Sequence, residues 1–194
     1  MAVKRIYLLF TDTGTVFTKT IKLYTRKQYN HASISFDEEL TQLYSFGRKN
    51  PRNPFIGGFV KENINEGLFK KAICAVYCLP VEEADYYRMQ QYISRIEAQK
   101  EYYRYNLIGL FAIILNMQLK RENAFFCSEF VASVLKQSDT IDFNTPLSLV
   151  APHDLQTLKN LELVYQGKLK DYQKKAVNEH HLEMIEAQAD MISI

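Results

Sequence analysis

The residue best suited to chemistry in this sequence is Cys127, which lies in the segment Phe-Phe-Cys-Ser-Glu-Phe-Val-Ala-Ser-Val-Leu at residues 125–135. From Cys127 onward the apolar residues recur at the spacing of one helix face, so the cysteine falls in the first turn of a predicted helix. Free N–H groups and the positive end of the helix dipole lower the pKa of a thiol there and favour the reactive thiolate. The alternative is that Cys127 is the first small apolar residue of a core helix, because free cysteines are commonly buried.

Cysteine chemistry needs a base near the sulfur, normally a histidine, and a third group that orients the imidazole. Among the 4 histidines, His31 is the best candidate because it begins a predicted strand and is followed by small, alternating residues. Its ring can therefore point into a cleft from a rigid element, although a structural role is the alternative. His153 is expected at the surface in the first turn of a helix, and His180 and His181 in a charged, solvated tail.

The other cysteines, Cys74 and Cys78, share one predicted strand. A spacing of four residues separates them by ~13 Å, which is too far for a disulfide or a shared metal ion. We expect both in the core. The sequence has no glycine-rich phosphate loop, no metal-spaced Cys/His set and no serine nucleophile elbow. We therefore expect neither a cofactor nor a metal ion.

The composition is that of an ordinary globular protein, since 47% of the 194 residues are hydrophobic and 24% are charged. This length suits one domain. A formal net charge of +2 argues against strong attraction to nucleic acid or to an anionic membrane. No stretch approaches the ~18 apolar residues of a membrane span, so we expect no transmembrane segment. An odd number of cysteines, 3, without an export signal indicates reduced thiols and a cytoplasmic location.

The periodicities predict strands first, then helices, then a closing strand, which is an α+β order. The expected strands are Lys4–Thr11, Thr18–Tyr24, Tyr29–Phe36, Leu40–Phe46, Lys71–Leu79 and Leu161–Tyr165. The basic segment Gly47–Gly58 is rich in Gly and Pro and is expected to be a loop.

Beside the Cys127 helix, further helices are expected from Pro80 to about Tyr103, from Asn106 to Met117, and from Pro152. From residue 168 onward the chain is polar and charged. We therefore expect one domain over residues 1–167 and a charged, helical, solvated tail over residues 168–194.

Two motifs resemble those of a known family. Residues 30–36 (Asn-His-Ala-Ser-Ile-Ser-Phe) and 43–47 (Leu-Tyr-Ser-Phe-Gly) resemble the histidine-strand hairpin of the circularly permuted NlpC-type papain-like hydrolases, the YiiX-like group. Residues 125–131 resemble the nucleophile helix of that group, and residues 152–155 resemble its late Pro-x-Asp-Leu segment. Lecithin:retinol acyltransferase-like enzymes share the same order, with the histidine before the cysteine. The resemblance covers about residues 4–165 and implies a papain-like, permuted fold whose antiparallel sheet packs against the helix that bears the cysteine.

The resemblance implies that Cys127 is the nucleophile and His31 the general base. In the family, the third, orienting group comes from the strand after the histidine strand. Here we expect Tyr44 in that place, with its hydroxyl accepting from the imidazole, and Ser45 as the second choice. The residues expected to bind substrate are Ser128, Tyr7 and Asn30.

The implied activity is that of a cysteine hydrolase, an amidase or peptidase that works through a thioester on Cys127. Two other functions are open. The apolar segment Leu107–Leu115 would line an acyl-chain groove in a lipid-directed thiol acyltransferase or acyl hydrolase. A protein that keeps the fold without turnover would be a ligand-binding protein. The expected partner is a small amide, a peptide or a lipid-like substrate, and not a nucleic acid.

Overall fold

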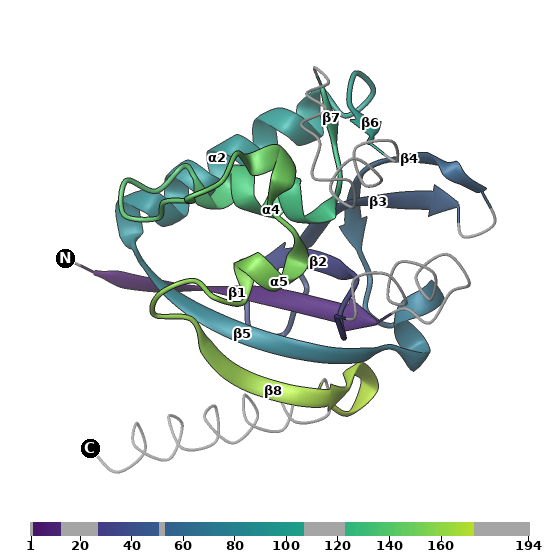
Figure 1. Ribbon diagram of the computed structural model, residues 1–194, viewed down its shortest axis with the longest axis horizontal. Coiled ribbons are helices and arrows are strands. Elements are labelled where there is room, and N and C mark those ends of the chain that lie inside the picture. Colours follow the sequence, from purple (N-terminus) through teal and green to yellow (C-terminus); the bar gives the residue numbers. More distant parts are fainter. Residues whose placement is uncertain (1, 13–26, 51–52, 107–122, 173–194) are drawn as a thin grey trace, which may run out of the picture.

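The computed structural model describes residues 2–12, 27–50, 53–106 and 123–172. These residues form an α+β fold on a six-stranded antiparallel sheet with the strand order β4-β3-β2-β1-β5-β8 (Figure 1). The strands are β1 (Val3–Asp12), β2 (His31–Ser35), β3 (Leu43–Asn50), β4 (Asn53–Glu62), β5 (Ile73–Glu82) and β8 (Glu162–Lys168). Strand β1 pairs with β2 on one side and with β5 along its whole length on the other, so the histidine strand lies near the middle of the sheet.

The helices α2 (Glu83–Ala98) and α4 (Cys127–Leu135) lie together on one face of the sheet (Figure 1). Shorter helical segments are η1 (Gly67–Lys71), η2 (Leu147–Leu149) and α5 (Pro152–Leu155). Two two-residue strands, β6 (Arg104–Tyr105) and β7 (Ala124–Phe125), form a parallel pair, and β7 lies just before α4. Strand β6 also lies against β4, so the chain that leads into α4 is held next to the β3–β4 hairpin.

Strand β1 buries side chains on both faces of the sheet, which explains its nearly continuous apolar sequence. Ile6, Leu8 and Phe10 belong to one core cluster with residues of α2 and α4, and we call this side the helix face. Tyr7 and Leu9 point to the opposite side, which we call the back face, and belong to a second buried cluster. The sheet is therefore the middle layer of the fold.

The loop expected at Gly47–Gly58 is a wrong prediction, because strands β3 and β4 run through it as a hairpin. Pro54 is tolerated near the start of β4 because β4 is an edge strand of this sheet. At Gly57, a Cβ would lie 2.5 Å from the carbonyl oxygen of Gly47 and 2.7 Å from the Cβ of Tyr105. The glycine that indicated a loop thus permits close packing of β4 against β6.

The helix expected from Pro80 begins later, because Pro80 belongs to β5 and α2 begins at Glu83. Pro80 pairs with Arg5 of β1 and lies beyond the residues of β5 that pair with β8, so a missing N–H is tolerated there. The helix also ends at Ala98 rather than near Tyr103. The expected strand Thr18–Tyr24 and residues 107–117 of the next expected helix lie outside the described residues.

The first residues of the expected solvated tail are packed on the protein. Strand β8 runs to Lys168, and residues 169–172 are helical. Leu169 and Tyr172 are each 1% exposed and belong to the buried cluster of the back face. The Tyr172 hydroxyl donates to the carbonyl oxygen of Glu38, at 2.8 Å. The boundary expected at residue 168 therefore falls inside a packed segment.

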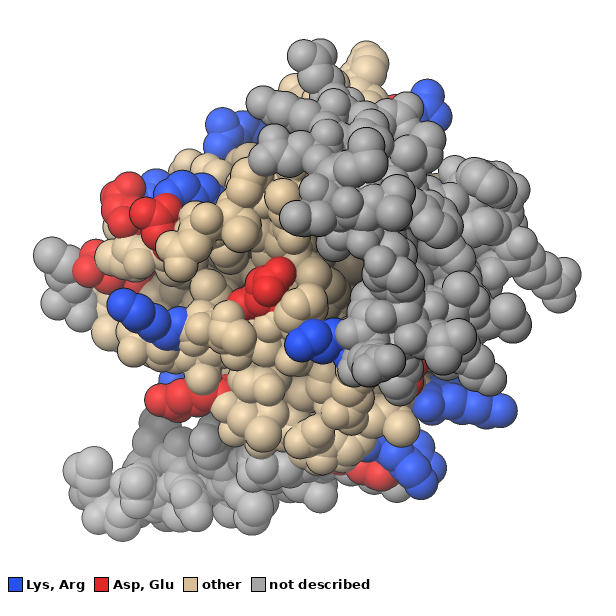
Figure 2. Space-filling view, viewed as in Figure 1, with Lys and Arg blue, Asp and Glu red and all other residues tan. Residues whose placement is uncertain are grey.

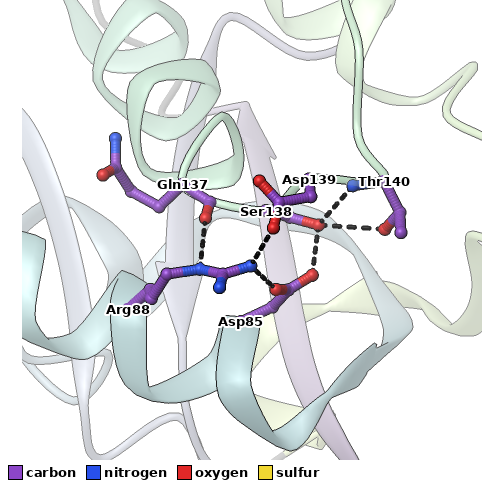
Figure 3. Close-up of polar contacts among 6 residues, drawn as sticks. All are labelled: Asp85, Arg88, Gln137, Ser138, Asp139 and Thr140. Carbon is purple, nitrogen blue, oxygen red and sulfur yellow. Dashed lines mark hydrogen bonds and ion pairs between the residues drawn. The ribbon is translucent and has the colours of Figure 1, made fainter.

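A network of polar contacts around Asp85 joins α2 to the segment that follows α4 (Figure 3). The buried Asp85 carboxylate pairs with Arg88 and accepts a hydrogen bond from the Ser138 hydroxyl. Arg88 in turn donates to the backbone oxygen of Gln137 at 3.0 Å and pairs with Asp139 at 2.8 Å. Because a buried carboxylate is costly without partners, these contacts hold the end of α4 against α2.

Within the described ranges, no helix is long and apolar enough to cross a membrane. On the face drawn in Figure 2, the described Lys and Arg residues are interspersed with Asp and Glu and form no continuous patch of one charge. The described residues of that face therefore create no extended field of a single sign.

Candidate active site

Cys127 is the first residue of α4 and is 3% exposed. Phe126 precedes it in an extended conformation, and the Phe126 carbonyl accepts the Phe130 N–H at 3.0 Å, which starts the helix. Residues 130–135 bury their apolar side chains in the cluster of the helix face, and this burial holds the helix on the sheet. The cysteine is thus fixed by the packing of the residues that follow it.

The sulfur of Cys127 lies at the edge of β2. Strand β2 pairs with β3 only at Ile34 and Ser35, so the two strands separate toward His31. The backbone N–H of Ala32 donates a hydrogen bond to the sulfur within that gap. Cys127 therefore approaches β2 at the part of the strand that is not paired with β3. This brings the first residue of α4 within reach of His31.

Three side chains form a continuous series of contacts. The Nε2 atom of His31 lies 2.8 Å from Oε1 of Glu62, the last residue of β4, and these side chains are 16% and 7% exposed. The imidazole also hydrogen bonds the Cys127 thiol. Because Nε2 contacts Glu62, the hydrogen bond with the Cys127 sulfur is assigned to the other ring nitrogen, Nδ1. The order Cys127–His31–Glu62 is that of a nucleophile, a base and an orienting group.

The pKa of His31 reflects two opposed effects. Burial alone lowers the pKa of an imidazole, because it disfavours the charged form. The Glu62 carboxylate and the hydrogen bond with Cys127 outweigh burial and raise the His31 pKa to about 10. We therefore expect the folded protein to hold His31 as an imidazolium at neutral pH.

The pKa of Cys127 is lowered, whereas that of His31 is raised. Burial alone raises it, but the hydrogen bond and the charge of His31 outweigh burial. The backbone N–H groups of Ala32 and Ser128 add to this effect, and the Cys127 pKa falls below its ordinary value. The pair therefore favours a thiolate beside an imidazolium, which is the reactive form of a nucleophilic cysteine.

Sequence reasoning missed Glu62. It lies at the end of the strand that was expected to be mostly loop, and it reaches across β3 to β2. The available signal was the pair Phe59-Val60, two residue types enriched in strands, which follows two glycines and directly precedes Lys61 and Glu62. A hairpin in that place puts an ionisable side chain beside the histidine strand.

The structure places the two predicted orienting residues differently. Tyr44 points to the helix face, where its ring stacks on Phe59 with centroids 5.9 Å apart. Ser45 points the other way, as strand alternation requires, and its hydroxyl donates to Glu62 Oε1 at 2.6 Å. The orienting position next to His31 therefore belongs to Glu62, with Ser45 as its neighbour.

Two of the residues expected to bind substrate lie next to the site but have partners within the protein. The Ser128 hydroxyl is buried and donates to the backbone oxygen of Val150 at 2.7 Å, so it fixes α4 to the segment before α5. The Asn30 side chain donates to Asp12 Oδ1 at 3.1 Å. Asn30 precedes His31 in the chain, and this bond ties the start of β2 to the end of β1.

The third expected binding residue, Tyr7, lies on the back face, where its hydroxyl donates to Glu38 at 3.1 Å. Burial and the Glu38 charge raise the Tyr7 pKa. Burial also raises the pKa of Cys74 to about 12, and that thiol lies in the same cluster. The partly exposed His153 lies 3.4 Å from Asp154 on α5. In the described part of the chain, no hydrogen bond or ion pair joins Tyr7, Cys74 or His153 to Cys127 or His31.

Within the described ranges, no group of three or more His, Cys, Asp and Glu residues is arranged to hold a metal ion. Comparison of the chain with models of known families, with curated proteins and with solved structures found no match. The site is therefore defined by its own geometry, in which a thiol, an imidazole and a carboxylate lie in contact.

Proposed function

We propose that this protein is a cysteine hydrolase, an amidase or peptidase, on a papain-like, circularly permuted fold. The observation that carries the proposal is the continuous contact from the Cys127 thiol through the His31 imidazole to the Glu62 carboxylate. The position of Cys127 at the start of a helix packed on an antiparallel sheet supports the same assignment. The sequence resemblance implies the same Cys127–His31 pair and the same packing of the cysteine helix on the sheet, although it led us to expect the orienting group on the strand after the histidine strand.

In the proposed reaction, His31 takes the proton of the Cys127 thiol, and the thiolate attacks the carbonyl carbon of an amide. The C–N bond breaks as the imidazolium returns the proton to the leaving amine, and the acyl group stays on sulfur as a thioester. Water, deprotonated by His31, then cleaves the thioester and restores the thiol. N–H groups of a first helical turn have no acceptor inside the helix, so the Cys127 N–H is the candidate donor to the oxyanion.

The proposal is tested by the rate of Cys127 alkylation with iodoacetamide at about pH 6 and about pH 8.5, followed by peptide mass spectrometry. The readout is the rate at about pH 6 divided by the rate at about pH 8.5. Taking this ratio within one variant cancels the limited access of the reagent to a buried thiol. We expect a ratio near one in the parent protein. In His31→Ala the ratio should drop roughly a hundredfold, because a free thiol has a pKa of ~8.5.

His153→Ala is the matched histidine control and should keep the parental ratio. Cys74 in the same digest is an internal reference for a buried thiol without an imidazole. Turnover is then tested with p-nitroanilide amides and p-nitrophenyl acyl esters, and the thioester is sought as added mass on Cys127. A parent ratio as low as that of His31→Ala would overturn the proposal.

The second candidate is a ligand-binding protein on the same fold, and the low exposure of Cys127, 3%, favours it. It predicts an intact fold in which Cys127 reacts only after unfolding. The acyl-chain groove expected along Leu107–Leu115 lies outside the described residues. Acylation of Cys127 by long-chain esters but not by amides would favour the acyl hydrolase instead.

A further inference from the structure

The Glu62 carboxylate has two partners besides His31. The Ser33 hydroxyl donates to its Oε2 at 2.5 Å, and the Ser45 hydroxyl donates to its Oε1 at 2.6 Å. Ser33 belongs to β2, Ser45 to β3 and Glu62 to β4, so three adjacent strands contribute to one polar cluster. Both carboxylate oxygens are thus occupied, and Oε1 is shared by Ser45 and His31.

Strand alternation gives this cluster its geometry. His31 and Ser33 are two residues apart on β2 and therefore point to the same face. Ser45 and Glu62 point to that face from the neighbouring strands, as their mutual hydrogen bond requires. Glu62 has to cross the width of β3 to meet His31, and its carboxylate accepts both hydroxyls there.

Both hydroxyls are deeply buried, since Ser33 and Ser45 are each 0% exposed. A buried hydroxyl is costly without a hydrogen-bond partner, and both serines direct theirs at the same carboxylate. Glu side chains have several rotatable bonds, so a carboxylate at the end of one is held in a single position only when donors fix it. The two serines supply those donors.

We propose that Ser33 and Ser45 are positioning residues that clamp the Glu62 carboxylate so that one of its oxygens faces the His31 imidazole. This inference rests on the proposed function, since it assigns the serines a part in setting up the same Cys127–His31 pair. Neither serine touches the reacting atoms. Their effect passes through Glu62 to His31 and only then to the sulfur.

The test compares Ser33→Ala, Ser45→Ala and the double variant with Ser35→Ala. Ser35 is a close control, because it lies on β2, points to the same face and is equally buried. Its hydroxyl donates to Asp37 at 2.6 Å instead of to Glu62. The readout is the ratio of Cys127 alkylation rates at about pH 6 and about pH 8.5, in variants whose circular dichroism matches the parent.

We expect the double variant to lower this ratio at least about fivefold, because a displaced carboxylate favours the imidazolium less. Each single variant should lower it by less, and Ser35→Ala should stay within about twofold of the parent. Ser45→Thr keeps a hydroxyl at this position on a residue suited to strands, so it should show the parental ratio, in contrast to Ser45→Ala. If the double variant does not fold, the two single variants and Ser45→Thr give the same comparison.

The outcomes separate the two proposals. A high ratio in the parent that is lost in His31→Ala but kept in the serine variants would overturn only the clamp. A low ratio in the parent would overturn the proposed function and the clamp together. An equal loss in Ser35→Ala would also overturn the clamp, because it would show a general effect of removing buried hydroxyls from β2.

Discussion

Cys74 and Cys127 are both buried thiols, yet their pKa values are shifted in opposite directions. For Cys74, burial dominates, and a backbone hydrogen bond from Gly167 only partly offsets it. For Cys127, the His31 imidazole and two backbone N–H groups outweigh the same penalty. Burial alone therefore does not decide whether a cysteine is reactive. The charged and hydrogen-bonding partners of the sulfur decide it.

Glu129, two residues after Cys127, is a carboxyl with few partners. Burial raises its pKa to about 7, against the opposing effect of a hydrogen bond from the Phe126 backbone, and its Oε2 atom has no hydrogen-bond partner among the described residues. A folded pKa above the unfolded one means that folding favours the protonated form. Protonated Glu129 therefore contributes fully to the stability of the folded protein below about pH 4.5. This contribution is lost as the pH rises toward about 7.

We expect Glu129→Gln to remove this pH dependence, because glutamine keeps the acceptor for Phe126 and cannot ionise. Between about pH 5 and about pH 8, the free energy of unfolding of the parent should fall relative to the variant by roughly 1–2 kcal/mol, allowing for partial exposure. Urea denaturation at the two pH values measures the difference. Parallel stability curves for the two proteins would contradict this expectation.

Among the elements, the sequence patterns located those with a strong periodicity. Strand β1 and helix α4 follow from their apolar residues, and β2 follows from its alternation. Strand β4 was hidden because Pro54, Gly57 and Gly58 read as breakers in a one-dimensional pattern. In three dimensions these residues suit an edge strand packed closely against β6, a contact that is not visible locally.

The contact between α2 and the segment after α4 gives a prediction for the stability of these elements. We expect Ser138→Ala to lower the free energy of unfolding by about 1–3 kcal/mol, because it removes a donor from the buried Asp85 carboxylate. Asp139→Ala, which removes an exposed partner of Arg88, should change it by about 0.5 kcal/mol or less. Urea denaturation of both variants checks this, and equal values for the two would contradict it.

At the scale of the molecule, both faces of the sheet are covered, and the chain that follows β8 covers part of the back face. The sequence predicted a solvated tail from residue 168 because the segment is polar and charged. Leu169 and Tyr172 are spaced as neighbours on one side of a helix and are both buried. Two apolar positions in a charged segment are too few for a periodicity to stand out.

We expect Tyr172→Ala to lower the free energy of unfolding by about 3–5 kcal/mol, since a large buried aromatic side chain is removed and its hydrogen bond to Glu38 is lost. Tyr102→Ala is the matched control, because Tyr102 is 76% exposed. It should change the stability by about 0.5 kcal/mol or less. Thermal or urea denaturation compares the two, and a small effect at Tyr172 would mean that the segment is dispensable for the fold.

The site shows the same limit of sequence reasoning. His31 and Cys127 were proposed as partners from motifs, and the structure brings them into hydrogen-bond contact. The orienting group depends on which residues of three neighbouring strands face one another, and that depends on the register of β2, β3 and β4. Register is a property of long-range pairing, so Glu62 and Ser33 were not identified from local pattern, and Ser45 was predicted only as the second choice for the orienting group.

The β3–β4 hairpin has consequences for how this protein can diverge. Ser45 and Glu62 both lie near its base, where the strands join the rest of the sheet. One residue inserted at the base would reverse the alternation and turn a site residue to the opposite face. Residues inserted at the tip lengthen the hairpin at little entropic cost and leave the pairing at the base unchanged. Among homologous sequences, we therefore expect insertions and deletions to collect at the tip of this hairpin while its base keeps its spacing.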